Sequence, residues 1–144
     1  MSNIWVVVAD ASRARFFKAD KPAGALDEIE TLSNPEMRLH EGDLVSDRGG
    51  RGNSGNGAKH GYGNANEAKD GSANRFAAEV CRHIEKGRNS QAFDRLYVMA
   101  APSFLGMLRK HQSDALRGLI RDEVATDVTT QSADRIRGRL PDYL

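Results

Sequence analysis

Three apolar segments near the amino terminus predict three consecutive β-strands. Residues 4–9 (IWVVVA) are apolar at every position, which is typical of a strand covered on both faces. Residues 13–20 alternate well enough for a second strand, with its two phenylalanines on opposite faces. Residues 25–34 give a weaker third strand that ends at an Asn-Pro turn. The short turns between these segments predict an antiparallel meander.

The pattern changes to a helical period later in the chain. Apolar residues recur at helical spacing between residues 76 and 84, so we expect a helix with Ser72 as its N-cap and Gly87 as its stop. A start one or two turns earlier, near Asn66, is the alternative, which Gly71 disfavours. The remaining segments predict, in order, a strand at 96–100, a helix opened by Pro102, a short helix capped by Ser113, a strand at 119–127 and a helix capped by Ser132.

The element order βββαβαβα predicts one α/β domain over residues 1–144. A meander followed by two right-handed βα units gives a mixed five-stranded sheet with flanking helices. The ribonuclease-H-like architecture has this order. The length of 144 residues fits a single hydrophobic core.

A long glycine-rich insert, at about residues 48–71, separates the meander from the first helix. Its start, RGGRGNSGNG, matches neither the P-loop nor the dinucleotide-binding fingerprint. Unstructured segments of this length are usually functional or disordered. Because ordering glycine is entropically expensive, we expect residues 49–66 to be mobile.

The insert also carries the residues that we predict to bind RNA. Its cations outnumber its carboxylates, and arginine among glycines suits contact with phosphates and unpaired bases, with an aromatic ring for stacking. A solvated loop without function has a similar composition, so that alternative stays open. The candidate residues are Arg48, Gly49, Gly50, Arg51, Lys59, His60 and Tyr62.

Composition limits the remaining classes of function. The formal net charge of +1 argues against bulk electrostatic capture of nucleic acid or membrane. No apolar run approaches the ~18–20 residues of a membrane span, and the amino terminus lacks the features of a signal peptide. The single cysteine, Cys81, fits a reducing compartment. We expect a cytoplasmic binding protein rather than an enzyme, with no cofactor and no metal.

Asp10 is the one catalytic candidate. It follows the first strand, where nucleases of ribonuclease-H architecture hold a metal-binding aspartate, and Glu79 and Asp94 are its possible partners. Two-metal chemistry needs such carboxylates around shared ions, which makes a metal-dependent nuclease an alternative function. The competing interpretation is a turn residue that bonds its own backbone. The four histidines show no metal spacing and are expected to be surface or cap residues.

Five segments in this order resemble the bacterial host-attachment protein family, described as proteins required for attachment to host cells. They are VVADASRARFF, DLVSDRGGR, RFAAEVCRHIEKG, FDRLYVMAAPSFLGMLR and ATDVT. The resemblance covers nearly the whole chain, and Ala101–Gly106 is its most specific part. It implies a fold shared with the middle domain of archaeal and eukaryotic peptide-release factors and their ribosome-rescue relatives.

In release factors a Gly-Gly-Gln loop precedes the long helix and reaches the peptidyl-transferase centre. Here Gly49-Gly50-Arg51 stands in a similar place, and the family usually has proline where Gly49 stands. Because the glutamine is absent, the resemblance does not imply peptidyl-tRNA hydrolysis. It implies a small RNA- or ribosome-associated binding protein. A further alternative is a regulatory module for host attachment whose insert orders on a protein partner.

Overall fold

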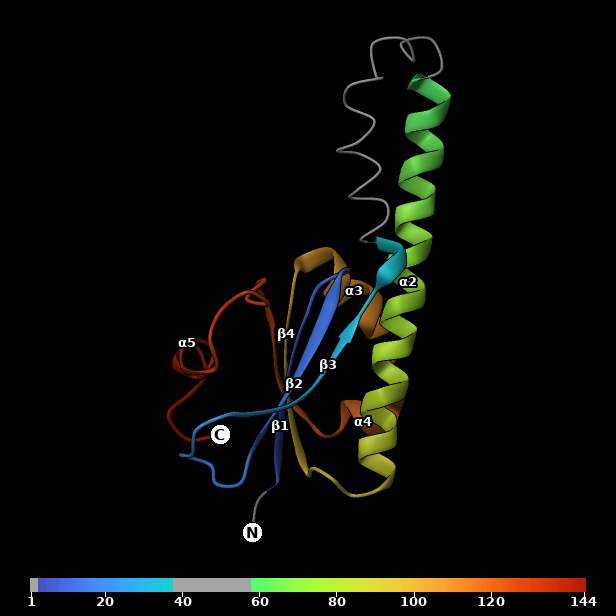
Figure 1. The fold of residues 1–144 in the computed structure, drawn as a ribbon. Coiled ribbons are helices and arrows are strands. Elements are labelled where there is room, and N and C mark those ends of the chain that lie inside the picture. Colours follow the sequence, from blue (N-terminus) through green and yellow to red (C-terminus); the bar gives the residue numbers. More distant parts are fainter. Residues whose placement is uncertain (1–2, 38–57) are drawn as a thin grey trace.

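The computed structural model describes residues 3–37 and 58–144, and it contains the predicted α/β domain (Figure 1). In chain order its elements are β1 (Ile4–Ala9), β2 (Arg13–Ala19), β3 (Asp27–Ser33), α2 (Ala58–Asn89), β4 (Arg95–Ala100), α3 (Pro102–His111), α4 (Asp114–Arg117), β5 (Ile120–Ala125) and α5 (Ala133–Gly138). Within these described ranges, no helix is both long and apolar enough to cross a membrane.

The five strands form one mixed sheet in the order β3-β2-β1-β4-β5. β1 pairs antiparallel with β2, and β2 with β3, which confirms the predicted meander. β4 lies parallel to β1, and β5 lies parallel to β4, as two βα units require. β1 is therefore the central strand, and the parallel half of the sheet starts from it.

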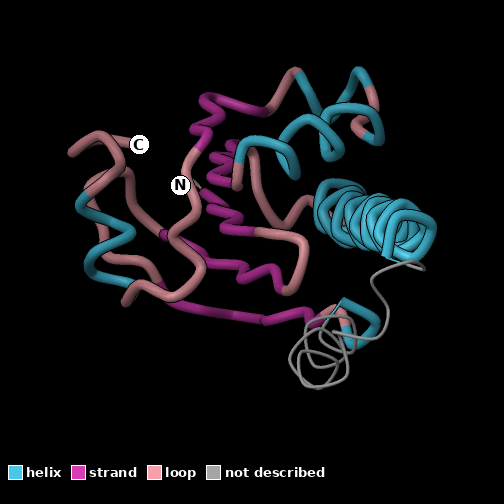
Figure 2. The backbone as a smooth tube through the Cα atoms, turned by 90° about the horizontal axis from the view of Figure 1, so that it is seen from above, coloured by secondary structure: helices cyan, strands magenta, loops and turns pink. Residues whose placement is uncertain are grey.

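Both faces of β1 are covered, as its uninterrupted apolar sequence predicts. Trp5 and Val7 belong to the core cluster under α2, α3 and α4, whereas Val6 and Val8 belong to the cluster on the α5 side. Figure 2 shows these two layers on opposite sides of the sheet. The phenylalanines of β2 divide in the same way, so the prediction that they face opposite sides is confirmed.

α2 begins at Ala58 and not at Ser72, so the predicted start of this helix was wrong. It has 32 residues, and its first half extends beyond the end of the sheet (Figure 1). Within the predicted insert, residues 58–71 are helical, and residues 48–57 lie outside the described residues. The apolar period starts near residue 73 because only the second half of α2 packs on the sheet. The mobility of residues 49–66 stays a prediction.

Gly87 lies inside α2 and does not end it. The helix ends two residues later in a Schellman arrangement, in which the Ala92 N–H donates to the Gly87 carbonyl at 2.8 Å and the Gln91 N–H to the Arg88 carbonyl at 3.0 Å. Gln91 takes the left-handed conformation, with a φ of 60°. Glycine is the usual residue there, and its absence removed the sequence signal for the true end.

Gly87 instead allows α2 to pack closely against the Trp5 ring of β1. A Cβ atom at this position would lie 2.6 Å and 2.8 Å from two carbon atoms of the Trp5 ring. Real Cβ atoms do not come that close to a ring, so only glycine lets β1 and α2 approach as they do. The Trp5 ring also contacts Phe93, at a centroid distance of 4.8 Å.

Two Gly→Ala changes in α2 should therefore have opposite effects. Gly71→Ala should raise the free energy of unfolding by up to about 1 kcal/mol, since alanine favours the helix and its Cβ would meet only the movable Arg75 side chain at 3.3 Å. Gly87→Ala should lower it by about 1–3 kcal/mol through overpacking against Trp5. Urea unfolding measures both. Equal effects of the two changes would contradict this account of α2.

Candidate nucleic-acid interface

A buried polar contact joins α2 to the sheet where the projecting half begins. The side-chain amide of Asn34 donates to the Ser72 hydroxyl at 3.1 Å and to the Ala11 carbonyl at 3.0 Å. Its oxygen accepts from the Met37 N–H at 3.4 Å. Asn34 and Ser72 are 6% and 1% exposed, so each would lose a buried partner if the other were removed. Ser72 therefore anchors the middle of α2 instead of capping its start.

An arginine–carboxylate ion pair and a histidine–carboxylate contact add to this attachment on the β3 side of α2. Arg75 pairs with Glu36, just after β3, and His83 pairs with Glu30 within β3. Partly exposed ion pairs contribute only about 0–1 kcal/mol each. The apolar core thus holds α2 on the sheet, and the polar contacts fix which side of the helix faces β3.

The structure places three of the seven predicted RNA-binding residues. Lys59, His60 and Tyr62 lie in the first turns of α2, in the half that projects from the sheet. The other four, Arg48 to Arg51, lie outside the described residues. The first turn of α2 contains no acidic residue. Because the amino-terminal end of a helix dipole is positive, this end of α2 favours an anionic partner.

The outer face of α2 carries a row of cations that the sequence analysis did not identify. Arg75, Arg82 and Lys86 are exposed and separated by seven and four positions, which places them on one side of the helix. One carboxylate, Glu79, lies among them and is exposed. The spacing was readable from the sequence, because the predicted helix between Ser72 and Gly87 already contains all three cations.

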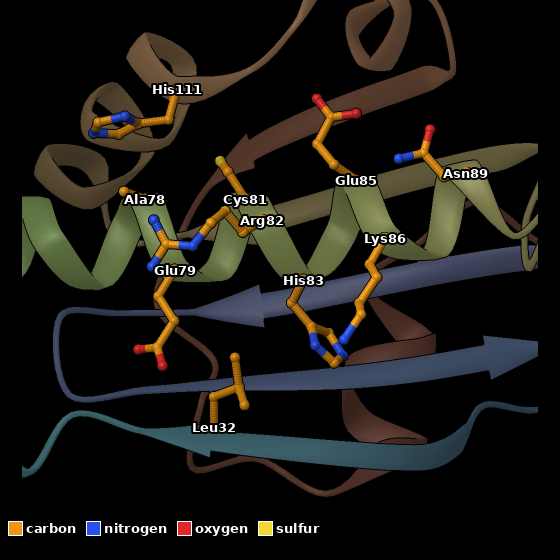
Figure 3. A pocket seen from close by; sticks show the side chains of 10 residues that line it. All are labelled: Leu32, Ala78, Glu79, Cys81, Arg82, His83, Glu85, Lys86, Asn89 and His111. Carbon is orange, nitrogen blue, oxygen red and sulfur yellow. The ribbon is translucent and has the colours of Figure 1, made fainter.

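A shallow depression of about 680 Å³ follows this side of α2 (Figure 3). Figure 3 shows that it extends from His111 on the α3 side to Leu32 on the β3 side, with Arg82 and Lys86 on the helix between them. Its lining consists of Leu32, Ala78, Glu79, Cys81, Arg82, His83, Glu85, Lys86, Asn89 and His111.

His83 contributes an aromatic ring to this depression. Its imidazole lies against Trp5 and Phe16, with centroid distances of 6.4 Å and 4.6 Å, and its Nε2 contacts Glu30. The side chain is 27% exposed. The ring therefore lies partly at the surface, as expected, and it also packs in an aromatic cluster that the sequence did not indicate.

Glu85, also in the depression, is neutralised by its own neighbours. Burial raises the pKa of its carboxyl, but hydrogen bonds from Ser113 and Arg88 outweigh burial, and the net pKa lies below the ordinary value. The two contacts are 3.3 Å from the Ser113 N–H and 2.8 Å from the Arg88 Nε. This carboxylate is thus compensated, and Glu79 is the other carboxylate that lines the depression beside Arg82 and Lys86.

Cys81 is buried, and its thiol is not activated. Burial raises the pKa of this thiol to about 12, with a smaller contribution from the Glu85 charge. The Sγ atom lies 3.4 Å from the Leu108 carbonyl oxygen, to which it donates. A thiol that stays protonated is a poor nucleophile.

Asp10 has the geometry of the predicted turn residue. Its Oδ1 accepts from the backbone N–H groups of Ser12 and Arg13 at 2.8 Å and 2.9 Å, and its Oδ2 accepts from the Thr129 hydroxyl at 3.0 Å. That hydroxyl also lies 2.8 Å from Asp127 Oδ1. One hydroxyl proton therefore serves two carboxylates. Among the described residues, no group of three or more histidine, cysteine and carboxylate side chains is placed to hold a metal ion.

The chain belongs to the host-attachment family, because the family model described as "Protein required for attachment to host cells" matches residues 5–140. No curated protein matched the chain. The family match confirms the resemblance seen in the sequence. It does not extend to the release-factor fold or to RNA binding.

Asp10→Asn should change the free energy of unfolding by less than about 0.5 kcal/mol. The amide oxygen keeps both turn bonds, and the amide N–H can donate to Thr129, whose proton is then free for Asp127. Asp10→Ala should cost about 1–3 kcal/mol, because it leaves those donors without an acceptor. Thermal and urea unfolding test this. Loss of a divalent-metal-dependent nuclease activity in Asp10→Asn would instead support the nuclease alternative.

Cys81 should make stability fall at alkaline pH. Its thiol ionises near pH 9 when unfolded but only near 12 when folded. Because the folded pKa is the higher one, this stabilisation is complete below pH 9 and is lost as the pH rises toward 12. The alkaline fall in unfolding free energy should be shallower in Cys81→Ala than in the wild type. If the unfolding free energy of the two proteins fell equally with pH, the fold would not raise the pKa of the Cys81 thiol.

Proposed function

We propose that this member of the host-attachment family is a small RNA- or ribosome-associated binding protein. The interface is the projecting half of α2 together with the glycine-rich segment before it. One observation carries the proposal: Lys59, His60 and Tyr62 lie on a helix that extends beyond the sheet, while the same helix is held on the core from Ser72 onward.

The composition of the projecting half supports a partner-binding role. It contains three glycines, Gly61, Gly63 and Gly71, each of which costs a helix about 1 kcal/mol relative to alanine. Tyr62 is its one large apolar residue. A helix with so little apolar surface contributes little to folding, so its length is better explained by contact with a partner.

The chemistry of the interface suits RNA. Lys59, together with Arg48 and Arg51, supplies charge for phosphates, and Tyr62 and His60 supply rings on which unpaired bases stack. Gly49 and Gly50 let the backbone approach a phosphate closely. Arg51 replaces the glutamine of the release-factor loop, so the proposed activity is binding without peptidyl-tRNA hydrolysis.

The family description names a phenotype and is compatible with this proposal. A protein that binds RNA acts on attachment through the expression of other proteins, without contacting the host cell. The net charge of +1 further implies that the affinity comes from a local surface, since the whole protein attracts nucleic acid weakly.

The proposal predicts separable effects of charge and stacking. Lys59→Ala and Arg51→Ala should each weaken binding of a labelled oligouridine by roughly 1 kcal/mol and reduce the salt slope by about 0.7 per lost phosphate contact. Tyr62→Ala should weaken it by about 1–3 kcal/mol without changing the slope. Fluorescence anisotropy over a range of salt concentrations measures both quantities.

Lys21→Ala is the matched control. Lys21 is exposed in the turn between β2 and β3, at the opposite end of the sheet from the projecting half of α2 (Figure 1). Its removal should leave affinity and slope unchanged. Wild-type affinity and slope in all three interface variants would reject this interface, and absence of binding to both oligouridine and purified ribosomes would reject the function.

A further inference from the structure

The depression along α2 combines two unpaired cations with a held aromatic ring. Within the part of the chain that the structure describes, Arg82 and Lys86 make no ion pair or side-chain hydrogen bond. They are one helical turn apart and both line the depression (Figure 3). Their charged groups point in different directions in Figure 3, but both side chains are long and exposed, so the two can turn toward one anion such as a phosphodiester.

The ring of His83 is oriented before any ligand arrives. Its Nε2 is fixed by Glu30, and its ring packs against Phe16 at a centroid distance of 4.6 Å and lies beside Trp5 at an interplanar angle of 22°. The partly exposed imidazole therefore needs no reordering to receive a flat ligand. Histidine is one of the side chains on which unpaired RNA bases stack. The volume of about 680 Å³ lies within the range of small-ligand sites, ~300–1,000 Å³.

We propose that this depression holds one nucleotide of a bound RNA strand, with its phosphate on Arg82 and Lys86 and its base against His83. The inference rests on the proposed RNA-binding function and extends the interface from the projecting half of α2 onto its packed half. Glu79 lies in the same lining and opposes the phosphate. Neutralising Glu79 should therefore strengthen RNA binding, which tests the site.

The first experiment measures the affinity for labelled oligouridine by anisotropy. Arg82→Gln and Lys86→Gln should each raise the Kd about fivefold, and Glu79→Gln should lower it about twofold. Arg121→Gln, which removes an exposed cation from β5, is the control and should not change the Kd. An equal loss in Arg121→Gln would show that only net charge matters and would overturn the site.

The second experiment uses Trp5, the one tryptophan of the chain, as a reporter of base stacking on His83. Oligouridine should change Trp5 fluorescence in the wild type and in His83→Phe, which retains a ring, but not in His83→Ala. Far-ultraviolet circular dichroism and melting establish that each variant is folded. If His83→Ala does not fold, Arg82→Gln replaces it in this test. At a non-saturating RNA concentration its change in Trp5 fluorescence should be smaller than that of the wild type, and an equal change would overturn the site.

Failure of the inference is distinguishable from failure of the function. If Lys59→Ala and Tyr62→Ala weaken RNA binding while the Arg82, Lys86 and Glu79 variants do not alter it, the depression is not a subsite and the proposed function stands. If the wild-type protein binds neither oligouridine nor ribosomes, both proposals are wrong. Binding of free uridine monophosphate with equal affinity would indicate a mononucleotide site instead and would overturn the RNA assignment.

Discussion

The packing of α2 against β1 is the contact on which the rest of the structure depends. Trp5 lies directly against Gly87, and the two elements come as close as they do because position 87 has no side chain. Ring contacts with Phe16, Phe93 and His83 surround the same tryptophan. This cluster fixes the carboxyl-terminal half of α2, and it thereby fixes the direction in which the other half leaves the sheet.

The two halves of α2 consequently have different sources of stability. From Ala73 to Ile84 the helix buries an apolar face, with each large side chain contributing about 1.5–3 kcal/mol. Before Ser72 its sequence has one large apolar residue, Tyr62, and several glycines. Helix propagation from a packed segment costs far less than starting a new helix. The packed half of α2 therefore allows residues 58–71 to continue the helix, although their sequence would not form a helix alone.

The sequence predicts this fold well where burial dictates the pattern. The bounds of β1 agree with its apolar run, and Ser113 and Ser132 cap their helices as expected, each accepting from an N–H three residues on. The start of α2 was missed because apolar periodicity reports where a helix packs and not where it begins. Ser72 resembles an N-cap by composition, and only the position of Asn34 shows that its hydroxyl is used for tertiary contact.

The pair of free cations on α2, Arg82 and Lys86, could not be predicted from the sequence, because charge pairing depends on the fold. A chain with a net charge of +1 shows an even mixture of acidic and basic residues, and the sequence does not reveal which charges are compensated. In the fold, Glu36 is paired with Arg75, Glu30 with His83, and Glu85 with Arg88. Arg82 and Lys86 are left with Glu79 as the exposed carboxylate beside them. A nearly neutral protein can therefore present two unpaired cations side by side, because the neighbouring carboxylates of the β3 segment and of α2, other than Glu79, are held by other side chains.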